Sequence, residues 1–201
     1  MIEVQQRRKY IGSGADMNVI LGQGTAMLEF RQQMRNSFGT ELDAVIIPIG
    51  NGGLLSGSLI ACADSGIRVF GAEPAIANHC QLWLEQGEKH RLRLASTTIA
   101  DGLRIDVQDL PFSLIRNNVE KVFTVSESKI AQAMKIVFEV LKLAIEPSAA
   151  VAVAMLLFDE GFRKLLDEGI GKVGIILEGG NVDTDSSEKL MPWLNCGPQH
   201  T

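Results

Sequence analysis

The chain has few cysteines, few aromatic residues and no long hydrophobic run. Its three cysteines, Cys62, Cys80 and Cys196, include no Cys-x-x-Cys pair, so the sequence indicates neither a disulfide framework nor a zinc site. No stretch reaches the roughly 18 consecutive apolar residues that a membrane-spanning helix needs, and the first residues lack the apolar core of a signal peptide. We therefore expect no membrane partner and a reducing, cytoplasmic setting.

Basic residues are not in excess either. The 19 lysines and arginines are outnumbered by 24 acidic residues, which leaves a net charge of −5. Because binding to nucleic acid needs a basic surface that neutralises phosphates, we expect no nucleic-acid partner. Of all residues, 46% are hydrophobic but only 5% are aromatic, which predicts a globular α/β protein packed mainly with Val, Ile, Leu and Ala.

Runs of β-branched and aliphatic residues predict four strands, at residues 44–49, 68–72, 121–125 and 173–177. The first and last runs are apolar nearly throughout, which is typical of strands buried on both faces of a parallel sheet. Between the strands, helical spacing predicts helices at residues 25–36, 54–64, 77–86, 110–118, 127–141 and 149–166, the last interrupted near Gly161. The alternation predicts an α/β fold with an open, mostly parallel sheet and helices on both faces.

The composition also suggests how the chain is divided. We expect a loose N-terminal segment over residues 1–20, one α/β domain over residues 21–190 and a C-terminal tail over residues 191–201. Residues 88–106 show weak periodicity and are expected to form a surface excursion.

A glycine-rich sequence stands where the first strand gives way to a helix: Pro48-Ile49-Gly50-Asn51-Gly52-Gly53-Leu54-Leu55-Ser56-Gly57. Glycines there allow backbone N–H groups to face an anion at the positive end of the helix, although such a turn can equally serve only to reverse the chain. The loop matches neither the dinucleotide fingerprint Gly-x-Gly-x-x-Gly nor a P-loop. A nucleotide-binding domain is therefore an interpretation that rests on this loop alone.

Read together, six motifs resemble the serine racemase and serine/threonine dehydratase family, in its order and approximate spacing. They are Gly22-Gln23-Gly24-Thr25, Gly50-Asn51-Gly52-Gly53-Leu54, Gly71-Ala72-Glu73-Pro74, Thr98-Ile99-Ala100-Asp101-Gly102-Leu103, Ile145-Glu146-Pro147-Ser148 and Glu178-Gly179-Gly180-Asn181-Val182-Asp183. The resemblance covers the C-terminal portion of that family. It implies the fold type II architecture of pyridoxal-phosphate (PLP) enzymes, PLP as the cofactor and an amino acid as the substrate.

The resemblance also implies roles for individual residues. Backbone amides of Gly50, Asn51, Gly52, Gly53 and Leu54 would bind the phosphate of PLP. Many relatives have four glycines in this loop; Asn51 replaces one of them, and a side chain that points outward would be tolerated.

Two acidic residues complete the implied cofactor site. Glu146 resembles the acidic residue near the cofactor ring, and the alternative is a helix-capping carboxylate before Pro147. Glu178 stands where the family usually places a serine that faces the pyridine nitrogen. A carboxylate would pair with a protonated pyridine and strengthen its electron withdrawal, which favours racemisation over simple β-elimination; alternatively Glu178 turns to solvent.

Some relatives bind a divalent cation at three positions, of which Glu73 and Ala77 match two. The third is an aspartate in those relatives and His79 here. Because Mg²⁺ and Ca²⁺ prefer oxygen ligands, we expect no metal site and interpret His79 as a solvated helix residue.

The family's Ser-x-Lys-x-Arg-Gly motif, which carries the lysine that holds PLP covalently, is absent from these residues. We therefore predict no catalytic residue here, no covalent attachment, and a sheet with an exposed edge and an uncovered apolar face. One hypothesis is a PLP-dependent ammonia-lyase (dehydratase) or racemase for serine- or threonine-like substrates, inactive alone, that forms a homodimer or pairs with an N-terminal part. The other is a catalytically dead interaction or regulatory protein with the same fold.

Overall fold

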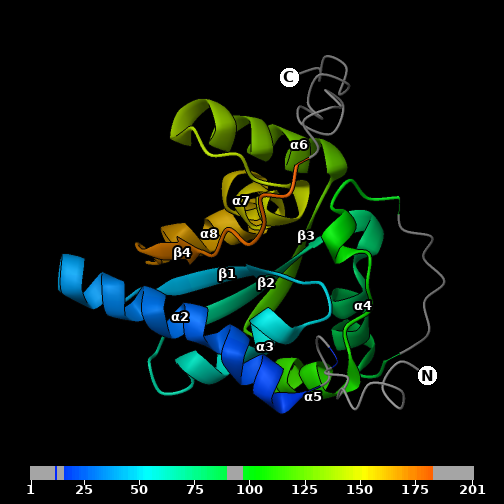
Figure 1. Cartoon of the computed structure of the whole chain (residues 1–201), viewed down its shortest axis with the longest axis horizontal. Coiled ribbons are helices and arrows are strands. Elements are labelled where there is room, and N and C mark those ends of the chain that lie inside the picture. The colour runs from blue at the N-terminus through cyan, green and yellow to red at the C-terminus, as the bar shows by residue number, and fades with distance from the viewer. Residues whose placement is uncertain (1–11, 13–15, 90–96, 183–201) are drawn as a thin grey trace, which may run out of the picture.

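Four parallel strands form the central sheet, in the order β3-β2-β1-β4 (Figure 1). The computed structural model describes residue 12, residues 16–89 and residues 97–182. The strands are β1 (Ala44–Pro48), β2 (Arg68–Pro74), β3 (Lys121–Val125) and β4 (Val173–Ile175). All four lie where the sequence predicts them, with ends that differ by at most two residues.

Seven α-helices pack around this sheet within the described residues. They are α2 (Met17–Phe38), α3 (Gly53–Cys62), α4 (His79–Gln86), α5 (Asp109–Asn118), α6 (Glu127–Ile136), α7 (Pro147–Phe158) and α8 (Glu160–Asp167). Short helical turns η1 (Ala75–Ala77) and η2 (Asp101–Leu103) lie between them, and the π-helical turn η3 (Val137–Leu141) continues α6. No helix among these residues is both long enough and apolar enough to cross a membrane.

Aspartate side chains explain two of the helix boundaries that differ from the prediction. Helix α2 begins at Met17, inside the segment that was expected to be loose, because the Asp16 side chain accepts a hydrogen bond from Asn18 N and so caps the helix. The break in the predicted helix at residues 149–166 falls at Asp159, near the expected Gly161. Asp159 ends α7 and caps α8, since its carboxylate accepts a hydrogen bond from Phe162 N at 2.8 Å.

Both faces of the sheet are covered by helices, as the sequence predicts (Figure 1). In β1, Ala44 and Ile46 pack into the core beneath α6, α7 and α8, whereas Val45 and Ile47 pack into the core shared with α2, α3 and α5. All five β1 residues are buried, and burying a Val or Ile side chain stabilises a fold by about 1.5–3 kcal/mol. The end of β1 is therefore held firmly in place.

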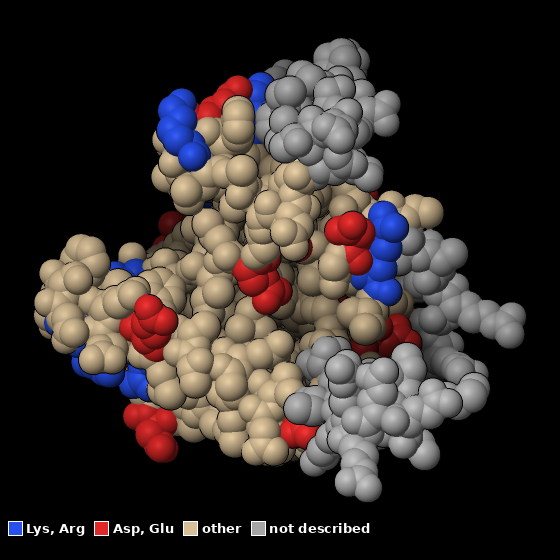
Figure 2. Space-filling view, viewed as in Figure 1, with Lys and Arg blue, Asp and Glu red and all other residues tan. Residues whose placement is uncertain are grey.

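The expected uncovered apolar face is not on the sheet. Exposed large apolar side chains lie instead on the outer side of α2, at Met17, Leu21 and Leu28, and within residues 138–143, where Val140 is 68% exposed. The edge strand β4 pairs only with β1 among the described residues. On the face shown in Figure 2, lysine and arginine side chains are scattered and do not gather into one patch.

Helices α2 and α3 cross at a pair of glycines. A Cβ added to Gly24 would lie 2.6 Å from the carbonyl oxygen of Gly57, and a Cβ added to Gly57 would overlap the carbonyl oxygen of Ile20. The helices can approach this closely only because neither position carries a side chain. This crossing fixes α3, whose first residues belong to the glycine-rich loop.

We predict that Gly57→Ala lowers the free energy of unfolding by about 1–3 kcal/mol, because the added methyl group forces the two helix backbones apart. Gly22→Ala is the matched control. Its Cβ would have no neighbour within 4 Å, so it should raise the free energy of unfolding by about 0.5–1 kcal/mol. Denaturant unfolding followed by circular dichroism measures both. Equal midpoints for Gly57→Ala and the unmodified chain would contradict the close crossing.

Candidate functional site

The most plausible site lies at the carboxyl ends of β1 and β4. Strands β2 and β3 follow one another outward from one edge of β1, whereas β4 pairs with the opposite edge of β1. The strand order therefore reverses between β1 and β4. Open α/β sheets bind ligands in the crevice at such a point. A pocket of about 400 Å³ lies there, and it is lined by six of the seven residues proposed from the sequence: Gly50, Asn51, Gly52, Leu54, Glu146 and Glu178. Gly53 lies in the same loop.

The glycine-rich loop is shaped by close contacts. Gly52 has φ +88°, a left-handed conformation that favours glycine, and a Cβ there would lie 2.8 Å from both Val107 Cγ1 and Pro111 Cβ. A Cβ on Gly50 would lie 3.1 Å from the carbonyl oxygen of Gly102. Gly52 is the N-cap residue of α3 and has no side chain to cap the helix. Gly52 itself therefore places no side chain between the positive end of the α3 dipole and the pocket.

Asn51 does not simply point outward, as the sequence interpretation allowed. Its Oδ1 atom accepts a hydrogen bond from Gly53 N at 2.9 Å, within the same loop. One backbone donor of the proposed phosphate site is therefore already engaged by a side chain that a glycine would not have.

Glu146 reaches the pocket from the start of α7. It is the N-cap residue of α7, but its carboxylate makes no capping bond, so the capping interpretation of this side chain is wrong. The backbone N of Glu146 instead donates to the carbonyl of Gly179 at 3.2 Å, and its Oε2 accepts a hydrogen bond from Asn181 N at 3.2 Å. These bonds tie α7 to the segment that follows β4.

Glu178 lies in that segment and lines the same pocket. Burial and, to a smaller extent, the nearby charge of Glu146 together raise the pKa of Glu178 to about 7. Neither lysine nor arginine is found among the described residues that line the pocket. The site therefore combines backbone donors at one end with two neighbouring carboxyl groups, one of which holds a proton near neutral pH.

The prediction of a surface excursion at residues 88–106 is wrong for its described C-terminal part. We name residues 98–108 the covering segment, because Gly102, Leu103 and Ile105 line the pocket opposite the glycine loop. Gly102 N donates to Ser148 Oγ at 3.1 Å, and Gln108 N donates to the carbonyl of Asn51 at 3.1 Å. These hydrogen bonds hold the covering segment over the glycine-rich loop. The weak periodicity of the sequence does not indicate this placement.

Two further lining residues were not proposed from the sequence. Gln23 Oε1 is buried without a hydrogen-bond partner among the described residues, and it lies where a Cβ on Gly53 would be. Ser148 is 2% exposed and bonds to the covering segment. Both stand in the six sequence motifs, but only the folded chain brings them to the pocket.

The region that corresponds to a cation site in some relatives has a different structure here. Both carboxylate oxygens of Glu73 accept backbone hydrogen bonds at 2.9 Å, from Cys80 N and Gln81 N, at the start of α4. His79 is only 5% exposed and contacts Asp106, so its interpretation as a solvated residue is wrong. Among the described residues, no three His, Cys, Asp or Glu side chains are placed to hold a metal ion.

The comparisons with known proteins agree with this geometry. The sequence model of the family described as "Pyridoxal-phosphate dependent enzyme" matches residues 2–179. The chain is 44% identical over 191 residues to serine racemase of Dictyostelium discoideum, covering 93% of this chain and 56% of that protein. It is 35% identical over 185 residues to L-threo-3-hydroxyaspartate ammonia-lyase of Saccharomyces cerevisiae, covering 90% of this chain and 53% of that protein.

A solved structure of the Dictyostelium discoideum serine racemase is similar over the same region. Its TM-score is 0.81 at 42% identity, and the match covers 90% of this chain and 56% of that one. The chain thus spans about half the length of the curated relatives that it matches.

We predict that Glu178→Gln changes how stability depends on pH. A carboxyl group with a pKa of about 7 in the folded chain and 4.5 otherwise binds its proton more tightly when folded. The raised pKa therefore contributes stability to the folded chain that is fully present below pH 4.5 and is lost as the pH rises through 7. At pH 8 the variant should be more stable than the unmodified chain by about 1–3 kcal/mol, and at pH 4 this gain should vanish. Denaturant unfolding across this range measures the difference, with the exposed Glu85→Gln as control; a constant difference would contradict it.

Proposed function

This chain belongs to the family of pyridoxal-phosphate-dependent enzymes, and from that premise we propose that it forms the cofactor-binding part of an amino-acid racemase or ammonia-lyase for serine- or threonine-like substrates. The observation that carries the proposal is the joint placement of the glycine-rich loop and Glu178 on one pocket at the switch point of the sheet. Each feature alone is compatible with many ligands. Together they match a ligand that has a phosphate at one end and a basic ring nitrogen at the other.

The residues present fit the phosphate of the cofactor. A side chain at Gly50 or Gly52 would meet the covering segment or the start of α5, and the glycines themselves line the pocket. The positive end of α3 supplies the favourable potential that a phosphate needs at a site lined by no basic side chain among the described residues. We propose that backbone N–H groups of residues 50–54 bind this phosphate.

The residues also fit the ring. When bound, pyridoxal phosphate withdraws electrons from the α-carbon of the substrate amino acid. Glu178, whose pKa is raised to about 7, can hold or share a proton at the ring nitrogen. A protonated ring withdraws electrons more strongly, which supports the hypothesis that racemisation is favoured over simple elimination in the active enzyme.

The relatives support the substrate class. A serine racemase and a hydroxyaspartate ammonia-lyase both match this chain over about nine tenths of its length. Both names refer to an amino acid that carries a hydroxyl group on its β-carbon. The polar side chains that line the pocket among the described residues are two carboxyl groups, a serine hydroxyl and two amides, which suit a small polar substrate.

A second candidate function is a regulatory protein that binds the cofactor without covalent attachment and interacts with an active relative. The observation that favours it is that none of the described lysines lines the pocket. Such a protein would keep the phosphate loop but could not fix the cofactor to itself.

Substitutions of Asn51 test the phosphate site. Asn51→Asp keeps the size and the hydrogen bond to Gly53 N but adds a negative charge beside the proposed phosphate, so it should weaken pyridoxal phosphate binding at least about tenfold. Asn51→Gly releases the Gly53 donor and should strengthen binding about three- to fivefold. Calorimetric titration at fixed salt concentration measures both affinities.

The exposed Asn117→Asp is the matched control for the added charge and should bind like the unmodified chain. Equal affinities for all four proteins would show that the phosphate does not bind at this loop.

Borohydride reduction tests the second candidate function. After incubation with pyridoxal phosphate and reduction, we expect the unmodified chain to carry no cofactor on any peptide, because no described lysine lines the pocket. Peptide mass spectrometry gives the result. A cofactor fixed to one lysine in the absence of any other polypeptide would exclude the second candidate and identify the missing catalytic group.

A further inference from the structure

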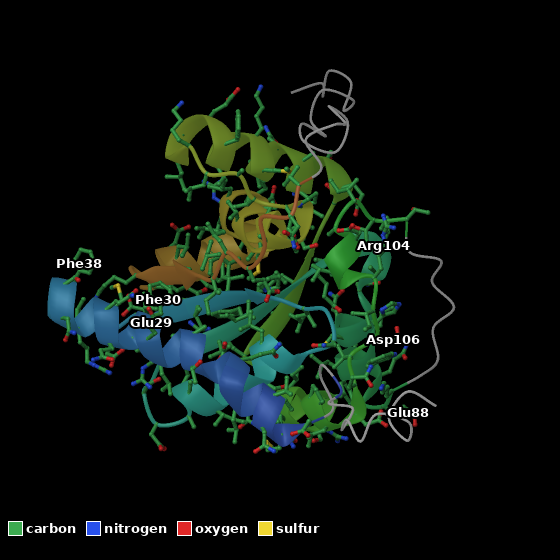
Figure 3. The ribbon with its side chains drawn as sticks, in the orientation of Figure 1. Glu29, Phe30, Phe38, Glu88, Arg104 and Asp106 are labelled. Atoms are coloured by element: carbon green, nitrogen blue, oxygen red, sulfur yellow. The ribbon has the colours of Figure 1, made fainter. Side chains whose placement is uncertain are left out.

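The covering segment is joined to α4 by a buried histidine. His79 Nδ1 lies 3.2 Å from Asp106 Oδ1, so the imidazole and the carboxylate contact each other at ion-pair distance. The two side chains differ in environment, since that of His79 is 6% exposed and that of Asp106 is 46% exposed. Figure 3 shows Asp106 on the strip of chain beside α4.

The imidazole of His79 has little freedom. It stacks on Trp83, with ring centroids 5.9 Å apart and planes 24° from parallel, and Trp83 is fully buried. Its other nitrogen, Nε2, is buried and has no hydrogen-bond partner among the described residues. Among the described residues, the contact with Asp106 is therefore the only polar contact of this side chain.

His79 itself is anchored to the sheet. It is the first residue of α4, and the next two backbone amides of that helix donate to the carboxylate of Glu73, which lies in β2. The Glu73 side chain is buried, which raises its pKa to about 8, and its two hydrogen bonds with backbone amides count strongly in this apolar setting. The path from β2 through α4 to Asp106 is thus short and rigid.

Asp106 sits between residues that touch the functional site. Ile105 lines the pocket, and Val107 lies against Gly52, where a Cβ would come within 2.8 Å. Gln108 N donates to the carbonyl of Asn51 at 3.1 Å. Holding Asp106 beside α4 therefore keeps its two neighbours, Ile105 and Val107, next to the pocket and the glycine-rich loop.

We propose that His79 is a positioning residue for the phosphate site: through Asp106 it holds the covering segment against the glycine-rich loop and so sets the affinity of that loop for the cofactor phosphate. The part that concerns the cofactor rests on the proposed function. The part that concerns the covering segment does not.

Amide hydrogen exchange of Gln108 tests the structural part in the full chain. His79→Leu and Asp106→Ala should each accelerate exchange at Gln108 about tenfold, while amides of β1 such as that of Ile46 keep their protection. His79→Asn, which can still donate to Asp106, should restore slow exchange. The double variant His79→Leu with Asp106→Ala should exchange no faster than either single variant, because both remove the same interaction.

A neighbouring ion pair provides the matched control. Lys89 Nζ lies 2.7 Å from Asp109 Oδ1 and 5.1 Å from the Trp83 ring centre, so it also joins the end of α4 to the start of α5. Asp109 is 94% exposed, and such pairs contribute little. Lys89→Met should leave Gln108 exchange within about twofold of the unmodified chain.

Binding of pyridoxal phosphate tests the functional part. His79→Leu should weaken it about five- to tenfold, and His79→Asn should return it to within about twofold. In a Trp193→Phe background Trp83 is the remaining tryptophan, and its fluorescence reports whether stacking on residue 79 is altered.

Unchanged Gln108 exchange in both His79→Leu and Asp106→Ala, with altered Trp83 fluorescence in the former, would overturn the inference. Faster exchange with unchanged cofactor affinity would overturn its functional part. If the unmodified chain binds no pyridoxal phosphate, the proposed function fails, and Gln108 exchange still decides whether His79 holds the covering segment.

Discussion

The close approach of three backbones around residues 50–53 is the constraint on which the rest of the site depends. The loop leaves a strand that is buried on both faces, so its start cannot move without disturbing both cores. Its helix is pressed against α2 at Gly57, and the covering segment lies on Gly50 and Gly52. Any side chain at these contacts would separate the elements. The backbone donors of the loop are therefore fixed in direction before a ligand arrives, which lowers the entropy lost on binding.

The electrostatics of the pocket follow from the same arrangement. With no basic side chain among its described lining residues, the pocket can attract an anion only through oriented peptide groups at the start of α3. At its other side, burial and the nearby charge of Glu146 raise the pKa of Glu178 to about 7. A ligand with an anionic group at one end and a basic group at the other suits such a pocket better than a uniformly charged ligand.

The fold was largely readable from the sequence, because its patterns are local. Buried strands appear as unbroken aliphatic runs, and each of the four was placed within two residues. Helix α2 was placed less well: the polar residues and glycines before Thr25 suggested a loose segment, but the Asp16 cap and the burial of Ile20 against α3 extend the helix to Met17. The roles of His79 and of residues 98–106 were misjudged because their partners stand far away in the sequence.

The sequence by itself determined the fold class and the position of the glycine-rich loop, because periodicity and turn chemistry are properties of neighbouring residues. The residues proposed for a cofactor followed from the resemblance of six motifs to a known family. Only the tertiary structure decided which of these residues meet. It turned Asn51 back onto Gly53, placed Glu178 beside Glu146 and buried His79 against Trp83 with Asp106 as its partner. Hydrogen-bond direction, burial and the proton affinity of a carboxyl group depend on distances between segments, and those distances exist only after the sheet has assembled.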